Sequence, residues 1–240
     1  MRDKLHTLKQ ELVDGVIALA EERIAKDKQA EAKSFIKQFY ANVAPQDILS
    51  EEVEDLFGSA LSIWAFGKTR APGVAKIRAY NPRFESAGWQ SPHTVIEIVN
   101  DDMPFLVDSV TTALTAQDLT VHLVIHPILK LNRSSSGKAE ALLDQDEPSD
   151  DMIRESFMQL RISEQSSAEV LSSIEAELHS VLDDVRASVE DWRTMREKVL
   201  DVVTEIGVRE TPHNREEVSE VIDFLRWIED NHFTFLGYRE

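Results

Sequence analysis

The chain of 240 residues contains no cysteine, which excludes disulfide bonds, thiolate catalysis and cysteine-based zinc sites. A chain without cysteine is typical of a reducing compartment, so we expect a cytoplasmic protein. The sequence also lacks any apolar run close to the ~20 residues that a membrane-spanning helix needs. Its first residues, MRDKLH, lack the apolar stretch of a signal peptide.

Basic residues are scarce relative to acidic ones, and the formal net charge is −18. Nucleic acids and anionic membrane surfaces both attract positive surfaces, so we expect neither as a partner. The simplest interpretation of the acidity is solubility. Because 42% of the residues are hydrophobic, the chain can still bury a core of ordinary size.

The eight glycines are scattered and form neither a G-x-G-x-x-G fingerprint nor a P-loop. The chain therefore has no recognisable means of binding NAD, and we expect no cofactor in it. His122 and His126 have the spacing of a metal pair on a helix, but they lie in a predicted strand. Four strand residues span about 13 Å, too far for two ligands of one ion, so we interpret both histidines as structural or surface residues.

Up to residue 71 the apolar side chains recur at three- and four-residue steps, which predicts helices. We expect three, at about 5–19, 27–42 and 50–64, and Ser50 is the predicted N-cap of the third. Pro72-Gly73 ends this helical segment.

The spacing then changes to that of extended chain. The predicted elements are strands at 74–80 and 93–99, a helix at 104–117, and strands at 120–131 and 153–162. An aspartate cap at Asp101–Asp102, with Pro104 in the first turn, marks the start of the helix. Residues 133–150 are polar and predict a loop.

This order supplies most of a ferredoxin-like βαββαβ unit, whose strands lie in the order 4-1-3-2. The strand at 74–80 can replace the missing last strand, which gives a permuted arrangement. We therefore predict an α+β fold: N-terminal helices, an antiparallel sheet with helices on one face, and long C-terminal helices. Pro127 supports an edge position for the 120–131 strand, and an exposed edge invites pairing with another subunit.

The segment 166–206 contains neither glycine nor proline, and its apolar residues keep a heptad seam that only Ser188 interrupts. It predicts either one straight helix roughly 60 Å long or two antiparallel helices. The apolar seam could belong to the protein core, to a subunit interface or to a rigid connector between domains. Two capping boxes and one C-cap are predicted nearby: Ser166 with Glu169, Asn214 with Glu217, and Gly207.

The candidate binding residues gather at one strand-to-helix turn: Asp101, Asp102, Asp108 and Ser109. The structural interpretation is helix capping, which contributes ~0.5–2 kcal/mol, together with dipole complementarity. The functional interpretation is an effector site, in which these carboxylates bind the ammonium group of an amino acid beside the helix N-terminus.

The sequence DMPFLVDSV at 102–110 resembles the loop and helix start of ACT domains, which typically read Asp-Arg-Pro-Gly-Leu-Leu. More specifically, two blocks resemble the N-terminal region of large-type bacterial NAD-specific glutamate dehydrogenases. The first combines residues 95–110 with VHLVIHP at 121–127, and the second is NHFTFLGYRE at 231–240. Residues 233–240 predict the start of a strand that belongs to a following domain.

The resemblance implies a parent enzyme of amino acid catabolism that deaminates L-glutamate to 2-oxoglutarate and ammonium with NAD. Its catalytic core would lie outside this chain, since none of the family's catalytic residues falls within it. The ACT-like modules would serve allosteric regulation and oligomer assembly, with sister domains, subunits of a homo-oligomer and an amino-acid effector as partners. Amino-acid-binding ACT domains usually have glycine where this chain has Phe105, whose side chain would fill the ligand space, so this departure favours a structural module.

We divide the chain into a helical segment (1–71), an ACT-like module (72–185) and a helical connector (186–240). Three functions are compared: an amino-acid sensor of this or another metabolic enzyme, an assembly module, and a stand-alone enzyme. The sequence offers no catalytic constellation for the third.

Overall fold

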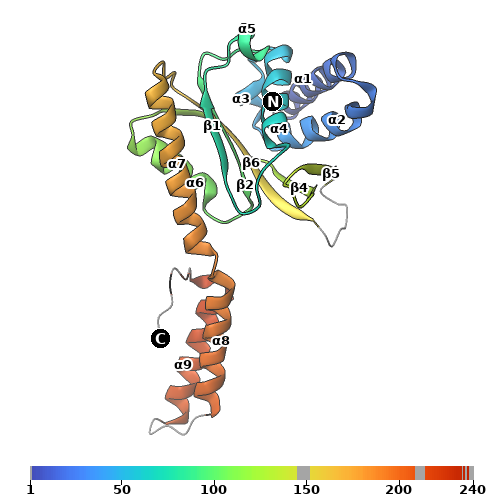
Figure 1. Ribbon diagram of the computed structural model, residues 1–240. Helices are drawn as coiled ribbons and strands as arrows, with labels where there is room; N and C mark the ends of the chain where they lie inside the picture. The colour runs from blue at the N-terminus through green and yellow to red at the C-terminus, as the bar shows by residue number, and fades with distance from the viewer. Residues whose placement is uncertain (1, 145–151, 209–213, 234, 236, 238–240) are drawn as a thin grey trace. The chain divides into compact units, whose positions relative to one another are not determined.

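The computed structural model describes residues 2–144, 152–208, 214–233, 235 and 237 (Figure 1). The chain divides into two compact units, Met1–Leu182 and Asp183–Glu240, and one helix runs from the first unit into the second. The strand start expected at 233–240 lies largely outside the described residues.

Four helices open the first unit: α1 (Arg2–Arg23), α2 (Lys26–Tyr40), α3 (Pro45–Ile48) and α4 (Val53–Gly67). They confirm the helices expected from the apolar spacing and add the short α3, where proline suits the first helical turn. The N-cap of α4 is Glu52, so the prediction that Ser50 caps this helix is wrong. Aromatic rings form the centre of the core between these helices and the sheet: Phe35, Phe39, Trp64 and Phe157.

In the described part of the chain, six strands form one antiparallel sheet: β1 (Lys76–Tyr80), β2 (Thr94–Asp101), β3 (Val121–Ile125), β4 (Ile128–Arg133), β5 (Ala139–Leu143) and β6 (Ile153–Ile162). The strand order is β1-β2-β6-β4-β5, and β3 also pairs with β6. The hairpin of β1 and β2 places β1 where the fourth strand of a ferredoxin-like sheet would lie. The predicted permuted order is confirmed.

The long strand expected at 120–131 is divided into β3 and β4, which pair with successive parts of β6. The interruption lies at Pro127, whose carbonyl accepts a hydrogen bond from the Phe157 N–H at 3.0 Å. Within the described residues β3 pairs only with β6, whereas β4 pairs with both β6 and β5. The predicted edge position is therefore correct for β3 and wrong for β4.

The strand β5 lies in a segment for which we expected a polar loop. The turn before it closes at Gly137, whose φ of 78° is left-handed. A Cβ at this position would also lie 2.0 Å from the Arg70 carbonyl oxygen, so only glycine fits. After this turn the chain runs back antiparallel to β4, with Leu142 opposite Leu131, and this pairing makes residues 139–143 the additional strand β5.

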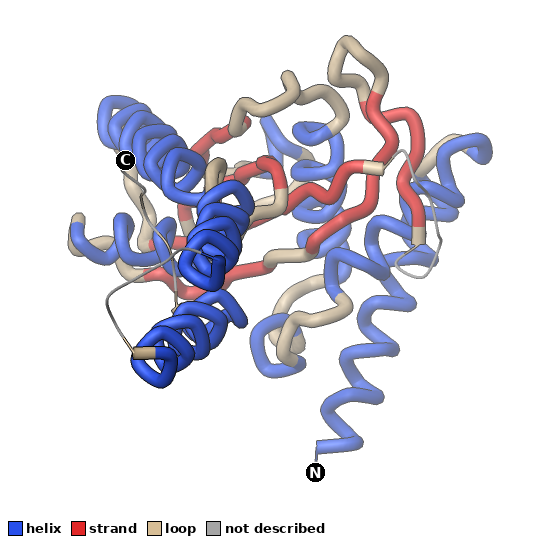
Figure 2. Tube along the Cα trace, turned by 90° about the horizontal axis from the view of Figure 1, so that it is seen from below, coloured by secondary structure: helices blue, strands red, loops and turns tan. Residues whose placement is uncertain are grey.

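Helices cover both faces of the sheet in the first unit. Val99 and Phe157, register partners on β2 and β6, point into the core beneath α2 and α4. Ile98 and Met158 point to the opposite face, because strand side chains alternate, and both are buried. Two helices cover that face: α6 (Leu106–Ala116) and the first part of α7 (Ala168–Val189), as Figures 1 and 2 show. A single turn of helix, α5 (Phe84–Ala87), lies between β1 and β2.

The segment 166–206 is two helices, because α7 ends at Val189 and α8 (Trp192–Val208) follows it. The break lies next to Ser188, the residue that interrupts the heptad seam. In the second unit α8 packs against α9 (Arg215–Trp227), which passes into the π-helical turn η1 (Ile228–His232).

The helix ends test the three predicted caps. The Asn214 cap is confirmed, since its side chain accepts a hydrogen bond from the Glu217 N–H at 2.8 Å. The cap of α7 is Ser167 rather than Ser166, and the Ser167 Oγ accepts from the Val170 N–H at 3.4 Å. Gly207 lies inside α8 rather than at its C-cap, so these two predictions are wrong.

Candidate functional site

The turn from β2 into α6 carries the predicted site residues Asp101, Asp102, Asp108 and Ser109. The first ends the strand, the second follows it, and the last two lie in the first turn of the helix. Phe105 occupies the N-cap position and the helix begins at Leu106, so the predicted aspartate cap and the start at Pro104 are wrong.

Arginines pair with two of these carboxylates. Arg70 donates from Nη2 to Asp101, and Arg154 donates from Nε to Asp102 at 3.1 Å. The Arg70 side chain is only 1% exposed. These ion pairs offset the negative charge of both carboxylates and so weaken their attraction for an amino-acid ammonium group. Asp108 lies exposed on the outside of the helix.

Phe105 takes the backbone conformation that glycine would supply at this turn. Its φ is 68°, in the left-handed region that costs an L-residue about 1–2 kcal/mol. Phe105 is 46% exposed, so its ring lies at the surface of the turn. The turn keeps a glycine-like backbone but holds a bulky ring at its surface.

A buried charge cluster lies next to Asp101, and the sequence analysis missed it. Glu155 of β6 accepts hydrogen bonds from Arg70 Nη2 at 2.7 Å and from Arg133 Nη2 at 2.6 Å. Arg133 also donates to the Gly67 carbonyl at 2.8 Å, at the end of α4. The cluster therefore ties the helical layer to β2, β4 and β6.

A second buried carboxylate, Glu97 in the middle of β2, has a similar role. It accepts from Arg78 Nε at 2.7 Å, from the Tyr80 hydroxyl at 2.9 Å and from Gln159 Nε2 at 3.2 Å. Gln159 Oε1 in turn accepts from the Ser59 hydroxyl of α4 at 2.6 Å. Burial and the charge of Glu97 raise the pKa of Tyr80, which therefore stays a neutral donor.

The histidines of β3 and the following turn lie apart and contact other polar groups. His122 lies 3.3 Å from the Ser163 hydroxyl and stacks on His93 with ring centroids 4.4 Å apart. His126 Nε2 lies 2.7 Å from the Ser156 hydroxyl. The described residues contain no group of three or more side chains able to hold a metal ion.

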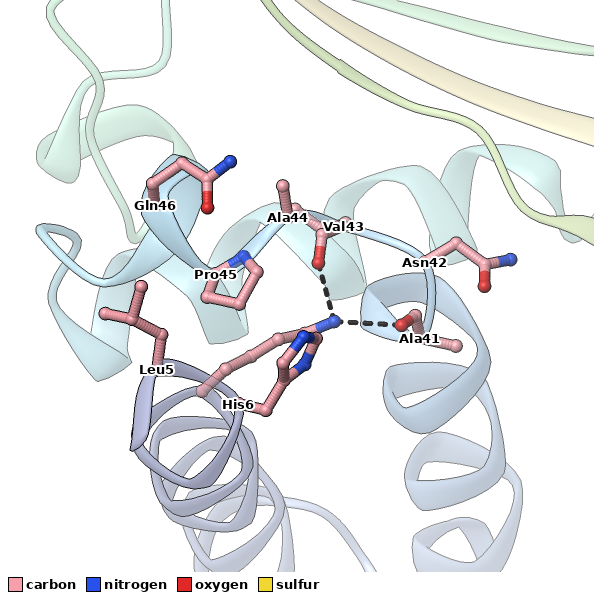
Figure 3. A pocket seen from close by; sticks show the side chains of 9 residues that line it. Leu5, His6, Ala41, Asn42, Val43, Ala44, Pro45 and Gln46 are labelled. Carbon is pink, nitrogen blue, oxygen red and sulfur yellow. Dashed lines mark hydrogen bonds between the residues drawn. The ribbon is translucent and has the colours of Figure 1, made fainter. Parts of the chain in front are cut away.

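A cavity of about 390 Å³ opens between the first turns of α1 and the loop that joins α2 to α3 (Figure 3). Lys9 lines it and donates from Nζ to the carbonyl oxygens of Ala41 and Val43, at 2.8 and 2.7 Å. The remaining lining residues are Leu5, His6, Asn42, Ala44, Pro45 and Gln46. Nothing in the sequence analysis singled out this cavity.

The outer side of α9 exposes a strip of large apolar residues, which we call the α9 strip: Val221, Phe224 and Trp227. Their exposed fractions are 47%, 58% and 52%. The rings of Phe224 and Trp227 stack with centroids 6.2 Å apart.

Among the described residues, no helix combines the length and the apolarity needed to cross a membrane.

The permuted antiparallel sheet, the Asp-Met-Pro turn into α6 and the two helices on one face define an ACT-like α+β module. Residues 35–178 match the family model described as glutamate dehydrogenase, ACT1 domain. That match covers more than half of the chain, and the chain belongs to this family.

Curated relatives agree with this assignment. The NAD-specific glutamate dehydrogenase of Halomonas elongata is 36% identical over 219 residues, which is 91% of this chain and 14% of that protein. The NAD-specific glutamate dehydrogenase of Pseudomonas aeruginosa is 34% identical over 206 residues, 86% of this chain and 13% of that protein. The chain thus spans about a seventh of the length of these relatives. The resemblance drawn from residues 95–127 and 231–240 is confirmed.

Proposed function

We propose that this chain is the N-terminal, non-catalytic segment of a cytoplasmic NAD-specific glutamate dehydrogenase and that its main role is assembly. The parent enzyme would convert L-glutamate to 2-oxoglutarate and ammonium with NAD bound outside this segment. The observation that carries the assembly role is the α9 strip. Soluble proteins rarely leave such a contiguous apolar surface uncovered unless it binds a partner.

Charge favours another domain of the same enzyme over a second copy of this segment as the partner. Glu220 and Asp223 lie beside the α9 strip on the same helix, and the whole chain carries a net charge of −18. Two copies would bring like charges together, which costs free energy at an interface. An apolar groove with a basic rim would fit both the strip and its acidic border.

Assembly can be tested in a chimera in which this chain replaces the matched part of the Halomonas elongata enzyme. Phe224→Ser with Trp227→Ser removes both rings of the α9 strip, and Phe84→Ser removes a similarly exposed ring from the first unit as a control. We expect light scattering to show smaller or unstable assemblies only for the strip variant. If the strip variant assembles like the control, the strip has no assembly role. Glutamate-dependent NAD reduction by the isolated chain would contradict its non-catalytic assignment.

Amino-acid sensing at Asp101, Asp102, Asp108 and Ser109 is the second proposal. It is supported by the exposed carboxylate of Asp108 at the start of α6. Calorimetry of the chain against the common amino acids at millimolar concentration would test it. Heat that disappears in Asp108→Asn would favour sensing, and no heat with any amino acid would remove this proposal.

A further inference from the structure

We propose that the cavity between α1 and the α2–α3 loop binds a small organic carboxylate, held by Lys9 and His6. This site lies in the helical segment, remote in sequence from the acidic turn, and goes beyond the assembly role. The two proposals can fail separately, because one concerns a ligand of the isolated chain and the other concerns its docking.

The size of the cavity suits a small metabolite. Its volume of about 390 Å³ falls in the lower part of the range of roughly 300–1,000 Å³ that is usual for small-molecule sites. Two separate parts of the chain build it, the start of α1 and the loop 41–46. Leu5 and Pro45, both labelled in Figure 3, are apolar lining residues and give the cavity an apolar wall.

The charge of the cavity is opposite to that of the chain. Lys9 and His6 are the ionisable residues that line it, and no carboxylate is among its nine lining residues. The chain as a whole carries a net charge of −18, so a lining without acidic groups selects for anions locally.

Lys9 keeps capacity for a ligand. An ammonium group has three hydrogens to donate, and the carbonyls of Ala41 and Val43 take two of them (Figure 3). These two bonds also stabilise the end of α2, where cations are favoured. Partial burial lowers the pKa of Lys9 because the ammonium is withdrawn from water, and a bound anion would compensate that loss of hydration.

The number of donors favours a carboxylate over a phosphate. One remaining N–H of Lys9 and one imidazole N–H of His6 can satisfy the two oxygens of a carboxylate. A phosphate carries more charge and more acceptor oxygens, and usually needs several donors or an arginine fork. The wall formed by Leu5 and Pro45 would contact the carbon chain of the ligand.

Isothermal titration of the 240-residue chain tests the proposal with four probes: butyrate, 2-oxoglutarate, neutral butyramide and inorganic phosphate. We expect the two carboxylates to bind at millimolar concentration or below, and butyramide and phosphate to bind much more weakly. Loss of one charge-assisted hydrogen bond in Lys9→Gln should weaken carboxylate binding by about ten- to hundredfold. Lys28→Gln makes the same charge change at an exposed position of α2 and should leave binding unchanged.

A second pair of variants covers the possibility that Lys9→Gln disturbs the fold. Leu5→Glu places a negative charge in the cavity without removing Lys9, and Leu8→Glu places the same charge on an exposed position of the same helix. Only the first should abolish binding. The proposal is overturned if neither carboxylate binds, if phosphate binds as tightly, or if the control variants lose binding to the same extent.

Discussion

Glu155→Gln tests whether the buried charge cluster holds the helical layer on the sheet. The substitution keeps the shape of the side chain but removes the charge shared by Arg70 and Arg133. All three side chains are at most 4% exposed. Breaking a buried ion pair by neutralising one partner typically costs about 3–5 kcal/mol, because the remaining charges stay buried.

The lower end of that range is the better expectation here. Arg70 keeps Asp101 as a partner, and Arg133 keeps the carbonyls of Gly67 and Gly137. We expect a loss of about 3 kcal/mol in the free energy of unfolding of the first unit. With a urea dependence of about 2 kcal/mol per molar, the midpoint should fall by about 1.5 M.

Tryptophan fluorescence during urea unfolding can measure this loss. Replacing Trp192 and Trp227 by phenylalanine leaves signals only from Trp64 and Trp89, both in the first unit. Glu164→Gln is the matched control, since its partner Arg83 and Glu164 itself are both substantially exposed and such pairs contribute about 0–1 kcal/mol. A loss for Glu155→Gln no greater than that of the control would refute the reasoning.

Three further perturbations follow from local geometry. Gly67→Ala would place a Cβ 2.2 Å from the Phe157 ring and should lower the free energy of unfolding by about 1–3 kcal/mol or more. Gly15→Ala would place a Cβ 3.5 Å from its nearest atom and should stabilise its helix by about 0.5–1 kcal/mol. Thermal unfolding of the two variants would measure this difference. Phe105→Gly relieves the left-handed backbone strain but makes the unfolded chain more flexible, and the two effects oppose each other. Urea unfolding should therefore show a free energy of unfolding that is unchanged or higher by up to about 1 kcal/mol. A clear loss of stability would contradict the strain. Burial lowers the pKa of His126, so the unfolded state binds its proton more readily and stability should fall as the pH drops below about 6.5; His126→Gln should flatten that part of a pH series of unfolding measurements.

Periodicity and strand topology could be predicted because they depend on the pattern of many residues at once. The run of β-branched residues in β2 and the apolar stripes of α2 and α4 each repeat the same signal several times. The order of the strands then follows from short connections and from the place of the 74–80 strand beside the next one. The two-helix outcome for 166–206 coincides with Ser188, the only polar position of its seam.

Features that depend on one or two residues were predicted less well. The strand β5 depends on the tight turn at Gly137, and its own sequence, AEALL, has little strand propensity. At the start of α6, Asp101 and Asp102 look like helix caps, but arginines from elsewhere in the fold pair with them. One local signal was available: Glu97 has two apolar residues on either side of it in β2, which indicates a buried charge with partners.

The buried carboxylates also bear on whether the ACT-like module is a separate domain, as the division at residue 71 predicts. The sheet face beneath α4 carries Glu97 and Glu155, and their network reaches the helical segment through Ser59 and Arg70. A chain that begins at residue 72 would expose Phe157 and leave Glu155 without one of its arginines. We expect such a truncated chain to lose cooperative unfolding and to aggregate, because it exposes both an apolar face and a partly neutralised charge. Sharp amide dispersion in the NMR spectrum of the truncated chain would contradict this expectation and would show that the helical layer is an accessory to an independent module.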